Sequence, residues 1–472
     1  MSSYTLNNTS LDKNKVFILQ KSEIEKRIDP TWYVYLKTIQ GFKYNKVPLK
    51  KLLLDNPQYG ANEIGIERTS LKQPRSIRIT DINEFGELEN DFGKTANVIV
   101  ERFILEPNDL LLARSGNTVG KSYLHKNVGY DCFFAGYMIR FKINTALVLP
   151  QYIFVYTQTD FYKKWVKAIQ RSTGQPNINA EEYRNLEIPL PNIEFQKKII
   201  ENYFNFLKQK QQNEAEAEKL LASIDTYLLN ELGITLPIQK ENTLKSRMFT
   251  TSFKEISSSR FDPHFNKVYF NEVFKSFSEA KYPIKKIKEV LENIKTGTTP
   301  HQKLNPYSEN DGFIFLRNTN LKKYQIDLSN TKYVQEQYEN LLTFSEKNEV
   351  IMCIAGTVGL SAKNDVENPI SINQNVSALK FFEDLVNPDF ATYWFNSDIF
   401  LELTKRSCSI ATIYYLNNDN LKLLPIPVPP LKKQIEIANH ITQIRRQAQE
   451  LKDKTKMALQ LANQEIENLL LN

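Results

Sequence analysis

The amino-acid sequence contains two copies of the same pattern, in the same order. The stretch EIEKRIDPTWY (residues 23–33) returns as ISSSRFDPHF (residues 256–265), and NDLLLARSGNTVGKS returns as NEVIMCIAGTVGLS. The second pair aligns Gly120 with Gly359, a shift of 239 positions in a chain of 472 residues. Because repeats at a nearly constant shift indicate a tandem duplication, we expect two related modules.

Two further repeats lie within and at the end of each module. RSIRITDI returns as FIFLRNTNL, which aligns Arg78 with Arg317, and LEIPLPNIEFQKKI returns as LLPIPVPPLKKQIEI. Short apolar runs broken by Gly, Pro and Asn are typical of strands, and the amphipathic stretches between them are typical of helices. The pattern predicts an α+β domain in each copy, over residues 23–191 and 259–429.

A long helix is predicted after each domain. Prolines in IPLPNI and IPVPPL end the preceding structure and allow a helix to begin. Beyond them, apolar residues recur at heptad spacing and form a stripe that needs a partner. These residues are Ile199, Tyr203, Phe206, Ala217, Leu220, Ile224 and Tyr227 in the first copy, and Ile437, Ile441, Ile444, Ala448, Leu451, Ala458, Ala462 and Leu469 in the second.

The two predicted helices, over residues 192–232 and 430–472, are expected to pair with each other. We predict that they are antiparallel and coiled-coil-like, that they separate the two domains, and that a pseudo-two-fold axis relates the two copies. Residues 1–22 are expected to form an N-terminal extension, and residues 233–258 a polar linker.

Composition restricts the classes of partner. The chain carries 61 basic and 54 acidic residues, a net charge of +7, which is compatible with nucleic acid but not specific to it. The three cysteines are scattered, as expected in a reducing compartment. The start lacks the apolar stretch of a signal peptide, and no apolar run approaches the ~18 residues of a membrane span. We therefore expect a cytoplasmic protein without membrane association.

The segment RSGNTVGKSY resembles a phosphate-binding loop at first sight. A P-loop requires GxxxxGK[ST], but only three residues separate Gly116 from Gly120, and the second copy has Leu360 in place of Lys121. We interpret the segment as a tight glycine turn after an apolar strand, where glycine lets the backbone approach a ligand closely. A nucleotide-binding enzyme that uses the Lys121 loop stays as the alternative.

Motifs of common catalytic and metal sites are absent from the sequence. It lacks HExxH, GxSxG, a dinucleotide-binding GxGxxG after a strand, and the [ND]PP[YF] motif of an adenine methyltransferase. The four histidines are isolated and lack the spacing of metal ligands. We predict no catalytic and no metal-binding residue, and interpret the chain as a binder with two heads. A coiled-coil adaptor with two protein-binding heads is a further alternative.

Three repeated patterns together resemble the specificity subunit of type I restriction–modification enzymes. They are R-(I/F)-D-P, a strand followed by G-T-V-G (G-N-T-V-G in the first copy), and I-P-(L/V)-P-x-x-x-x-Q-x-x-I, which leads into a long helix. The resemblance spans roughly residue 23 to the C-terminus. It implies two target recognition domains that each read one half of a split DNA sequence, with two helices that set their separation. The specificity subunit of a type IIB-like enzyme, with a fused methylase–nuclease partner, is a close alternative.

The resemblance also implies partners and cofactors. The partners would be double-stranded DNA, two modification (methyltransferase) subunits docked on the helices, and restriction or translocase subunits. S-adenosylmethionine, ATP and Mg²⁺ would be used by those subunits, in adenine methylation and ATP-driven cleavage of foreign DNA, and no cofactor is expected in this chain.

Candidate DNA-contacting residues lie in matched loops of the two copies, which carry side chains suited to base edges and phosphates. In the first copy they are Arg78, Thr80, Arg114, Ser115, Asn117, Thr118, Lys121, Arg171, Gln175 and Asn177. In the second copy they are Arg317, Asn318, Thr319, Thr357, Ser361, Arg406 and Tyr414. The second copy lacks the Gly-Gln-Pro of residues 174–176, so its loop differs in chemistry from that of the first.

Overall fold

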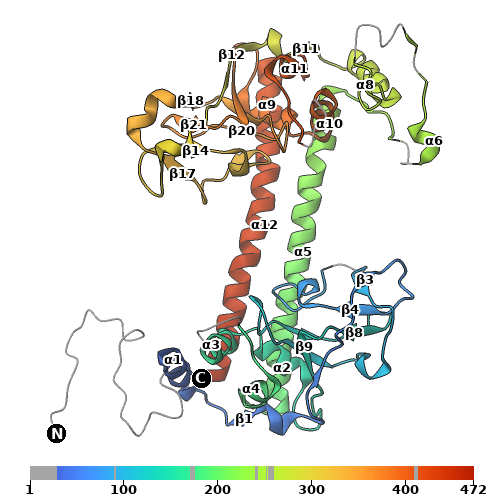
Figure 1. Cartoon of the computed structure of the whole chain (residues 1–472), viewed down its shortest axis with the longest axis vertical. Helices are drawn as coiled ribbons and strands as arrows, with labels where there is room; N and C mark the ends of the chain where they lie inside the picture. Colours follow the sequence, from blue (N-terminus) through green and yellow to red (C-terminus); the bar gives the residue numbers. More distant parts are fainter. Residues whose placement is uncertain are drawn as a thin grey trace, which may run out of the picture. The chain divides into compact units, whose positions relative to one another are not determined.

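The computed structural model describes residues 29–89, 92–170, 176–239, 243–250, 252–253, 260–408 and 413–471 (Figure 1). The chain divides into two compact units. Unit 1 comprises residues up to Asn213 together with those from Asp453 onward, and unit 2 comprises Glu214–Lys452. The predicted extension over residues 1–22 lies outside the described residues. Each unit therefore contains one globular part and a segment of both long helices.

Unit 1 is a mixed α/β body with two small four-stranded sheets. One sheet has the order β2-β9-β6-β7 and the other β3-β5-β4-β8, and a separate pair joins β1 to β10. The strands are β1 (Lys46–Pro48), β2 (Gln58–Tyr59), β3 (Ile66–Glu67), β4 (Arg75–Ile77), β5 (Lys94–Thr95), β6 (Leu110–Ala113), β7 (Ser122–Leu124), β8 (Cys132–Phe134), β9 (Met138–Phe141) and β10 (Glu187–Pro189). The helices of the globular part are α1 (Pro30–Gln40), α2 (Pro150–Tyr156), α3 (Asp160–Ile169) and α4 (Ala180–Arg184).

Unit 2 repeats this design with longer strands. Its larger sheets have the orders β12-β22-β19-β20 and β13-β17-β14-β21-β18, beside the pairs β11-β23 and β15-β16. The strands are β11 (Ile284–Lys286), β12 (Leu291–Thr296), β13 (Tyr307–Ser308), β14 (Phe313–Leu316), β15 (Leu321–Lys322), β16 (Gln325–Ile326), β17 (Lys332–Val334), β18 (Thr343–Ser345), β19 (Val350–Cys353), β20 (Ser361–Lys363), β21 (Ile370–Ile372), β22 (Val376–Phe381) and β23 (Pro425–Pro427). Its helices are α8 (Val268–Ser278), α9 (Pro388–Phe395), α10 (Asp398–Ser407) and α11 (Asn418–Lys422), with α6 (Leu244–Arg247) in the preceding segment.

The duplication is visible in the strand pairing. In unit 1, β6 pairs antiparallel with β7 and β9, and β4 pairs parallel with β8. In unit 2, β19 pairs in the same way with β20 and β22, and β14 pairs parallel with β21. Both boundary pairs, β1 with β10 and β11 with β23, are antiparallel. The sequence prediction of two similar α+β domains is therefore confirmed.

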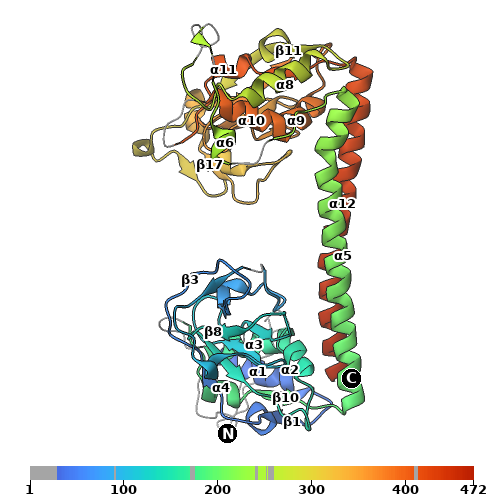
Figure 2. The ribbon, with the colours of Figure 1, turned by 90° about the vertical axis from the view of Figure 1, so that its right-hand side faces the viewer.

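Two long helices run through the chain: α5 (Ile193–Leu232) and α12 (Leu431–Leu471). In unit 1, the start of α5 packs on the end of α12, with Tyr203 and Ile466 in one core. In unit 2 the end of α5 packs on the start of α12, where Lys433 Nζ lies 2.6 Å from Glu231 Oε2. Each segment pair is therefore antiparallel and side by side (Figures 1 and 2). An apolar stripe on a lone helix is unstable in water, which explains why each unit takes up both helices.

A buried glutamine fixes the start of each long helix to its domain. Gln196 is 1 % exposed; its side chain accepts from the Leu149 backbone N–H at 2.9 Å and donates to the Pro191 carbonyl. Gln434 is fully buried and makes the equivalent bonds to the backbone of Asn387 and Pro429. Because buried backbone groups without partners are costly, these glutamines hold the helix and domain in one arrangement.

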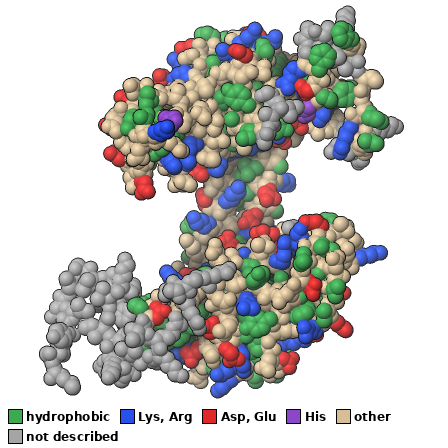
Figure 3. Space-filling view, viewed as in Figure 1, with side chains coloured by type: hydrophobic (Ala, Val, Ile, Leu, Met, Phe, Trp, Pro, Cys, Tyr) green, Lys and Arg blue, Asp and Glu red, His purple; other side chains and the backbone are tan. Residues whose placement is uncertain are grey.

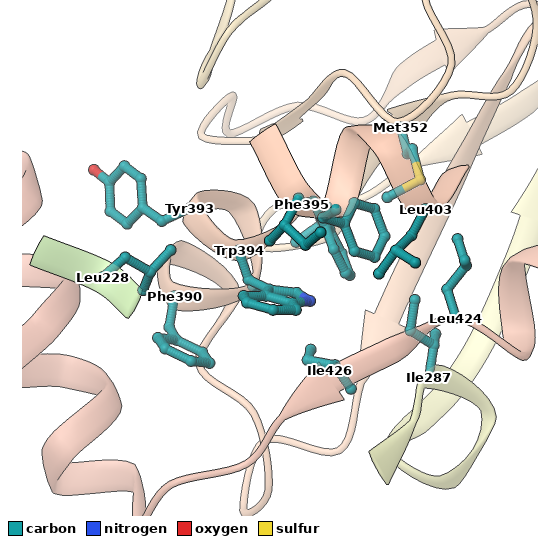
Figure 4. Packing of buried hydrophobic residues seen from close by; sticks show 14 of the residues in the cluster. Leu228, Ile287, Met352, Phe390, Tyr393, Trp394, Phe395, Leu403, Leu424 and Ile426 are labelled. Atoms are coloured by element: carbon teal, nitrogen blue, oxygen red, sulfur yellow. The ribbon is translucent and has the colours of Figure 1, made fainter. Parts of the chain in front are cut away.

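The core of unit 2 is built around Trp394. Its side chain is fully buried and its indole N–H donates to the Pro425 carbonyl at 2.8 Å. Figure 4 shows Phe390, Phe395 and Ile426 around the indole. Residues of helix α9 and of the proline-containing strand β23 thus contact the side chain of Trp394.

Unit 1 contains a buried imidazole that makes its stability depend on pH. His125 is 5 % exposed, its Nδ1 lies 3.1 Å from the Tyr123 hydroxyl, and burial lowers its pKa from 6.5 to about 4. The unfolded chain binds this proton more tightly than the folded chain does. The free energy of unfolding is therefore highest above pH 6.5 as far as His125 is concerned, and it decreases as the pH falls from 6.5 toward 4. We expect His125→Gln to remove roughly 2 kcal/mol of this loss in denaturant titrations across that range. The same change at the exposed His301 is the control, and parallel curves for wild type and His125→Gln would contradict the assignment.

Candidate functional site

The glycine turn lies at the end of a buried strand in both units. In unit 1 it joins β6 to β7, with Gly116 and Gly120 at φ of 87° and 88°. In unit 2 it joins β19 to β20, with Gly356 and Gly359 at 81° and 86°. These left-handed conformations favour glycine. A Cβ on Gly120 would also lie 2.6 Å from Val166 of α3, so the second glycine of the turn lets the turn pack against the helix.

The turn of unit 2 is one residue shorter than that of unit 1. In unit 1 the backbone N–H of Gly120 donates to the Ala113 carbonyl, and in unit 2 that of Gly359 donates to the Cys353 carbonyl. Seven positions separate the first pair and six the second. Asn117, which is exposed at the tip of the first turn, is therefore the residue without an equivalent. The sequences GNTVG and GTVG agree with this difference.

A second loop lies directly beside the glycine turn. In unit 1, Ser115 forms a bridge with Asn177, and the Gly116 N–H donates to the Pro176 carbonyl at 3.1 Å. In unit 2, Gly356 donates in the same way to the Tyr414 carbonyl. The structure thus brings together predicted residues that lie some sixty positions apart in the sequence. Two other predicted residues of this loop, Arg171 and Gln175, lie outside the described residues.

Arg114 is placed between the turn and a tyrosine. Its guanidinium lies 4.8 Å from the ring centre of Tyr59, a cation–π contact, and its Nε is buried without a hydrogen-bond acceptor. The side chain is half-buried, and within the part of the chain that the structure describes it forms no ion pair. Its positive charge is therefore available to an anionic partner. Ser115 is half-buried, and Thr118 is exposed with Asn117.

Lys121 points away from the turn. Its ammonium donates to the Ile82 carbonyl at 2.6 Å and lies 3.5 Å from that of Ile79. A P-loop lysine must instead reach the phosphates that the loop backbone holds. The geometry gives the nucleotide-binding alternative no support, and it leaves contact between Lys121 and DNA a prediction.

The strand-end arginines lie beside short 3₁₀ turns. Arg78 precedes the turn Ile79–Asp81, and Arg317 precedes the turn Asn318–Asn320. Thr80 and Thr319 are exposed in these turns. In unit 2 this turn adjoins the glycine turn. A Cβ on Gly356 would lie 3.5 Å from the side-chain amide nitrogen of Asn318. The backbone carbonyl oxygen of Asn318 lies 3.8 Å from Cys353 Sγ.

Two predicted contact residues have side chains that bond within the fold, so the geometry gives their contact with DNA no support. Ser361 is fully buried in β20, and its hydroxyl and carbonyl accept from the Asn396 amide at 3.0 and 2.8 Å. Arg406 lies over the Phe265 ring at 3.7 Å and donates to the Phe265 carbonyl at 2.8 Å. Burial lowers the pKa of its guanidinium to about 10. Both residues stabilise unit 2.

Exposed aromatic and aliphatic side chains beside the turns were not predicted. In unit 1, Tyr59 is 40 % exposed and Tyr137 is 67 % exposed, next to Arg114. In unit 2, Ile413, Tyr414 and Tyr415 are each at least 45 % exposed. Only Tyr414 was predicted, although the run Ile-Tyr-Tyr in a loop was a usable signal. Thr357, also exposed, completes this edge of unit 2. Unit 1 therefore offers an arginine, amides and two tyrosines at its glycine turn, and unit 2 offers mainly aromatic groups at the equivalent turn.

The electrostatics of the two units are mixed. In the view of Figure 3, basic and acidic side chains alternate over each unit. The face shown in this view thus carries no large patch of one charge sign. Among the described residues, no group of histidine, cysteine and carboxylate side chains could hold a metal ion. None of the described helices is long and apolar enough to cross a membrane.

Comparison with known proteins identifies a family model in both halves of the chain. The model, described as the type I restriction modification DNA specificity domain, matches residues 42–222 and again residues 279–461. The two matches together cover well over half of the sequence, and each extends from a globular part into the following long helix.

Individual relatives are distant in sequence but extend over most of the chain. The specificity subunit of the type I restriction enzyme MjaVIII from Methanocaldococcus jannaschii is 22% identical over 387 residues, 80% of this chain and 81% of that protein. The EcoKI specificity subunit of Escherichia coli K12 is 20% identical over 79% of this chain and 75% of its own. A solved chain from a study of complex assembly and conformational transition of the type I R-M system has a TM-score of 0.53, at 15% identity, over 90% of this chain and 96% of its own. That likeness concerns the fold.

Proposed function

We propose that this chain, which belongs to the family of type I restriction modification DNA specificity domains, selects the DNA sequence on which a restriction–modification complex acts. The observation that carries the proposal is a matched loop cluster, present once in each unit. Its framework, a glycine turn bonded to a second loop, is the same in both units, whereas its exposed side chains differ. Two sites with one framework and different chemistry fit two different half-sites.

The side chains of each cluster suit a distinct kind of readout. Arginine, asparagine and threonine in unit 1 can bond to base edges and phosphates. Exposed tyrosines in unit 2 can stack on bases or contact the thymine methyl group, and their hydroxyls can bond to phosphates. We assign the first half-site to Arg114, Ser115, Asn117, Thr118 and Asn177, with Thr80, Lys121 and the loop residues Arg171 and Gln175. We assign the second to Arg317, Asn318, Thr319, Thr357 and Tyr414.

The long helices are assigned the role of a spacer. A helix of 40 residues is about 60 Å long, and both α5 and α12 pass from one unit into the other. Two antiparallel helices that bury each other's apolar stripe resist bending, so they would hold the two domains at a set separation. The bases between the half-sites would then be counted without being read, as spacing follows dimer geometry in other DNA-binding proteins.

The catalytic steps are assigned to partner subunits. Modification subunits would dock on the helices and methylate adenine with S-adenosylmethionine, and restriction subunits would use ATP and Mg²⁺. We place the complex in the cytoplasm, where it would act against foreign DNA. The absence of catalytic motifs from the sequence and the family membership support a chain that recognises DNA without modifying it.

Methylome sequencing of the host, with and without the gene, tests this function. We expect deletion to remove one methylated adenine motif that consists of two specified blocks separated by unspecified bases. Reintroduction of the gene should restore that motif, and reintroduction with a stop codon at Gln196 serves as the control. An unchanged set of methylated motifs in a host with an active modification subunit would contradict the proposal.

A further inference from the structure

We infer that the arginines at the strand ends of the two units have different roles. Arg317 contacts the DNA, whereas its repeat equivalent Arg78 is a structural residue. The inference deepens the proposed function and rests on it. It does not follow from the alignment of the repeats, which pairs the two arginines and predicts the same role for both.

In unit 1, the strand-end arginine is neutralised within the protein. Nε and Nη2 of Arg78 bond to the two carboxylate oxygens of Asp81 at 3.0 and 2.6 Å. Asp81 is 4 % exposed, so its charge has little access to water. This bonding raises the pKa of Arg78, and a bidentate pair of this kind occupies the face of the guanidinium that a phosphate or a guanine would need.

In unit 2, the carboxylate is missing and an amide stands in its place. Asn320 occupies the position of Asp81, and its amide donates to the Asp327 and Asn330 carbonyls at 3.0 and 3.3 Å. Arg317 donates from Nη2 to the Asn330 carbonyl at 3.1 Å, and its Nε is buried without an acceptor. Within the described chain it forms no ion pair. The charge of Arg317 is therefore uncompensated.

The backbone of the two turns is the same, so the difference lies in the side chains. Arg78 has φ −113° and ψ 160°, and Arg317 has φ −114° and ψ 163°. The backbone N–H of each arginine donates to the side chain three residues later, at 3.0 Å in unit 1 and 3.1 Å in unit 2. A carboxylate at position 320 can therefore accept from the Arg317 backbone N–H as Asp81 accepts from that of Arg78, and it would exchange the two bonds that the Asn320 amide donates to carbonyls for a bond with the arginine side chain.

A lysine also lies beside each of the two turns, at a different position in the two copies. Lys121, which binds the carbonyls of the first turn, is Leu360 in the second copy. In unit 2, Lys322 donates to the Thr319 carbonyl of the second turn at 3.2 Å, so each turn has both an arginine and a lysine beside it. The turns differ at the arginine, which is paired with Asp81 in unit 1 and forms no ion pair among the described residues of unit 2. Arginine can bind a base or phosphate with two parallel bonds, which the lysine ammonium cannot.

Single substitutions in the full chain, assembled with its modification subunits, test this difference. We expect Arg317→Gln to weaken binding to the wild-type target DNA about tenfold. It should also flatten the dependence of log affinity on log salt concentration by about one. The matched control Arg78→Gln should change affinity less than about twofold, although it should lower the melting temperature because it leaves Asp81 buried and unpaired.

Moving the carboxylate provides the decisive pair of variants. Asn320→Asp should neutralise Arg317 and reproduce the weakened affinity and flatter salt dependence of Arg317→Gln, with no further effect when the two are combined. Asp81→Asn should free Arg78 and steepen the salt dependence. Equal effects of Arg78→Gln and Arg317→Gln on affinity, or independent effects of Arg317→Gln and Asn320→Asp, would overturn the inference. If the wild-type complex showed no sequence preference for DNA, the proposed function itself would fail.

Discussion

Lengthening α5 and α12 together by one helical turn is expected to move the two half-sites apart and to leave both half-sites unchanged. The insertions belong at the boundary between the two units in each helix, after Asn213 in α5 and after Lys452 in α12. Four residues add about 6 Å, which corresponds to roughly two base pairs of DNA. Methylation of the original target should fall to background, because the two domains no longer match both half-sites at once.

Mapping of methylated adenines in cells that carry the lengthened chain measures this result. A matched chain with the same four residues placed in the polar segment after residue 233, outside both long helices, should keep the original spacing. An insertion in α5 alone should destabilise the chain, because it shifts the apolar stripe of one helix against the other. An unchanged number of unread bases in the doubly lengthened chain would contradict the spacer assignment.

Replacing Trp394 by alanine is expected to lower the free energy of unfolding of unit 2 by about 3–5 kcal/mol. The indole is fully buried among the aromatic side chains of the core, and its N–H bonds to the Pro425 carbonyl. The change therefore leaves a cavity and a carbonyl without its donor. A denaturant titration in which proteolysis reports the unfolding of each unit would measure the decrease in the free energy of unfolding.

Two control substitutions locate this effect. Tyr414→Ala, at an exposed aromatic residue of the same unit, should change the free energy of unfolding by less than about 0.5 kcal/mol. Trp165→Ala, in the core of unit 1, should weaken unit 1 in the same range as Trp394→Ala weakens unit 2. A loss below about 1 kcal/mol for Trp394→Ala would show that the indole is not the centre of this core.

Much of the fold could be predicted because the chain repeats itself. Proline punctuation placed the starts of both long helices within a residue or two of Ile193 and Leu431, and the spacing of Ile437, Ile441 and Ala448 located a buried stripe. The glycine turn was placed correctly between two strands. These features depend on local chemistry, since proline and glycine restrict the backbone directly and heptad spacing fixes one face of a helix.

The candidate site could be predicted only in part, because exposure depends on tertiary packing. Ser361 and Arg406 looked like loop residues with free polar side chains, but Asn396 and Phe265, distant in sequence, contact these side chains, and Ser361 is fully buried. The extra Asn117 of the first turn is visible in the sequence, as GNTVG against GTVG, and the hydrogen bonds confirm its position. The ion pair between Arg78 and Asp81 could not be predicted from the sequence for a different reason. An arginine three residues before an aspartate reads as a solvated pair until the burial of the aspartate is known.

Each unit is proposed to read its own half of the target, and the exchange of one domain for the other tests this assignment. Residues 49–186 and 287–424 have equal lengths, and their ends are joined by equivalent hydrogen bonds, Leu49 N–H to the Leu186 carbonyl and Ile287 N–H to the Leu424 carbonyl, both at 2.9 Å. A chain in which the second segment replaces the first should retain both long helices. Methylome mapping of cells with this chain should reveal a target made of two inverted copies of one half-site, with the original number of unread bases between them. A target that still contained the replaced unit's half-site, or one with no symmetry, would contradict the account.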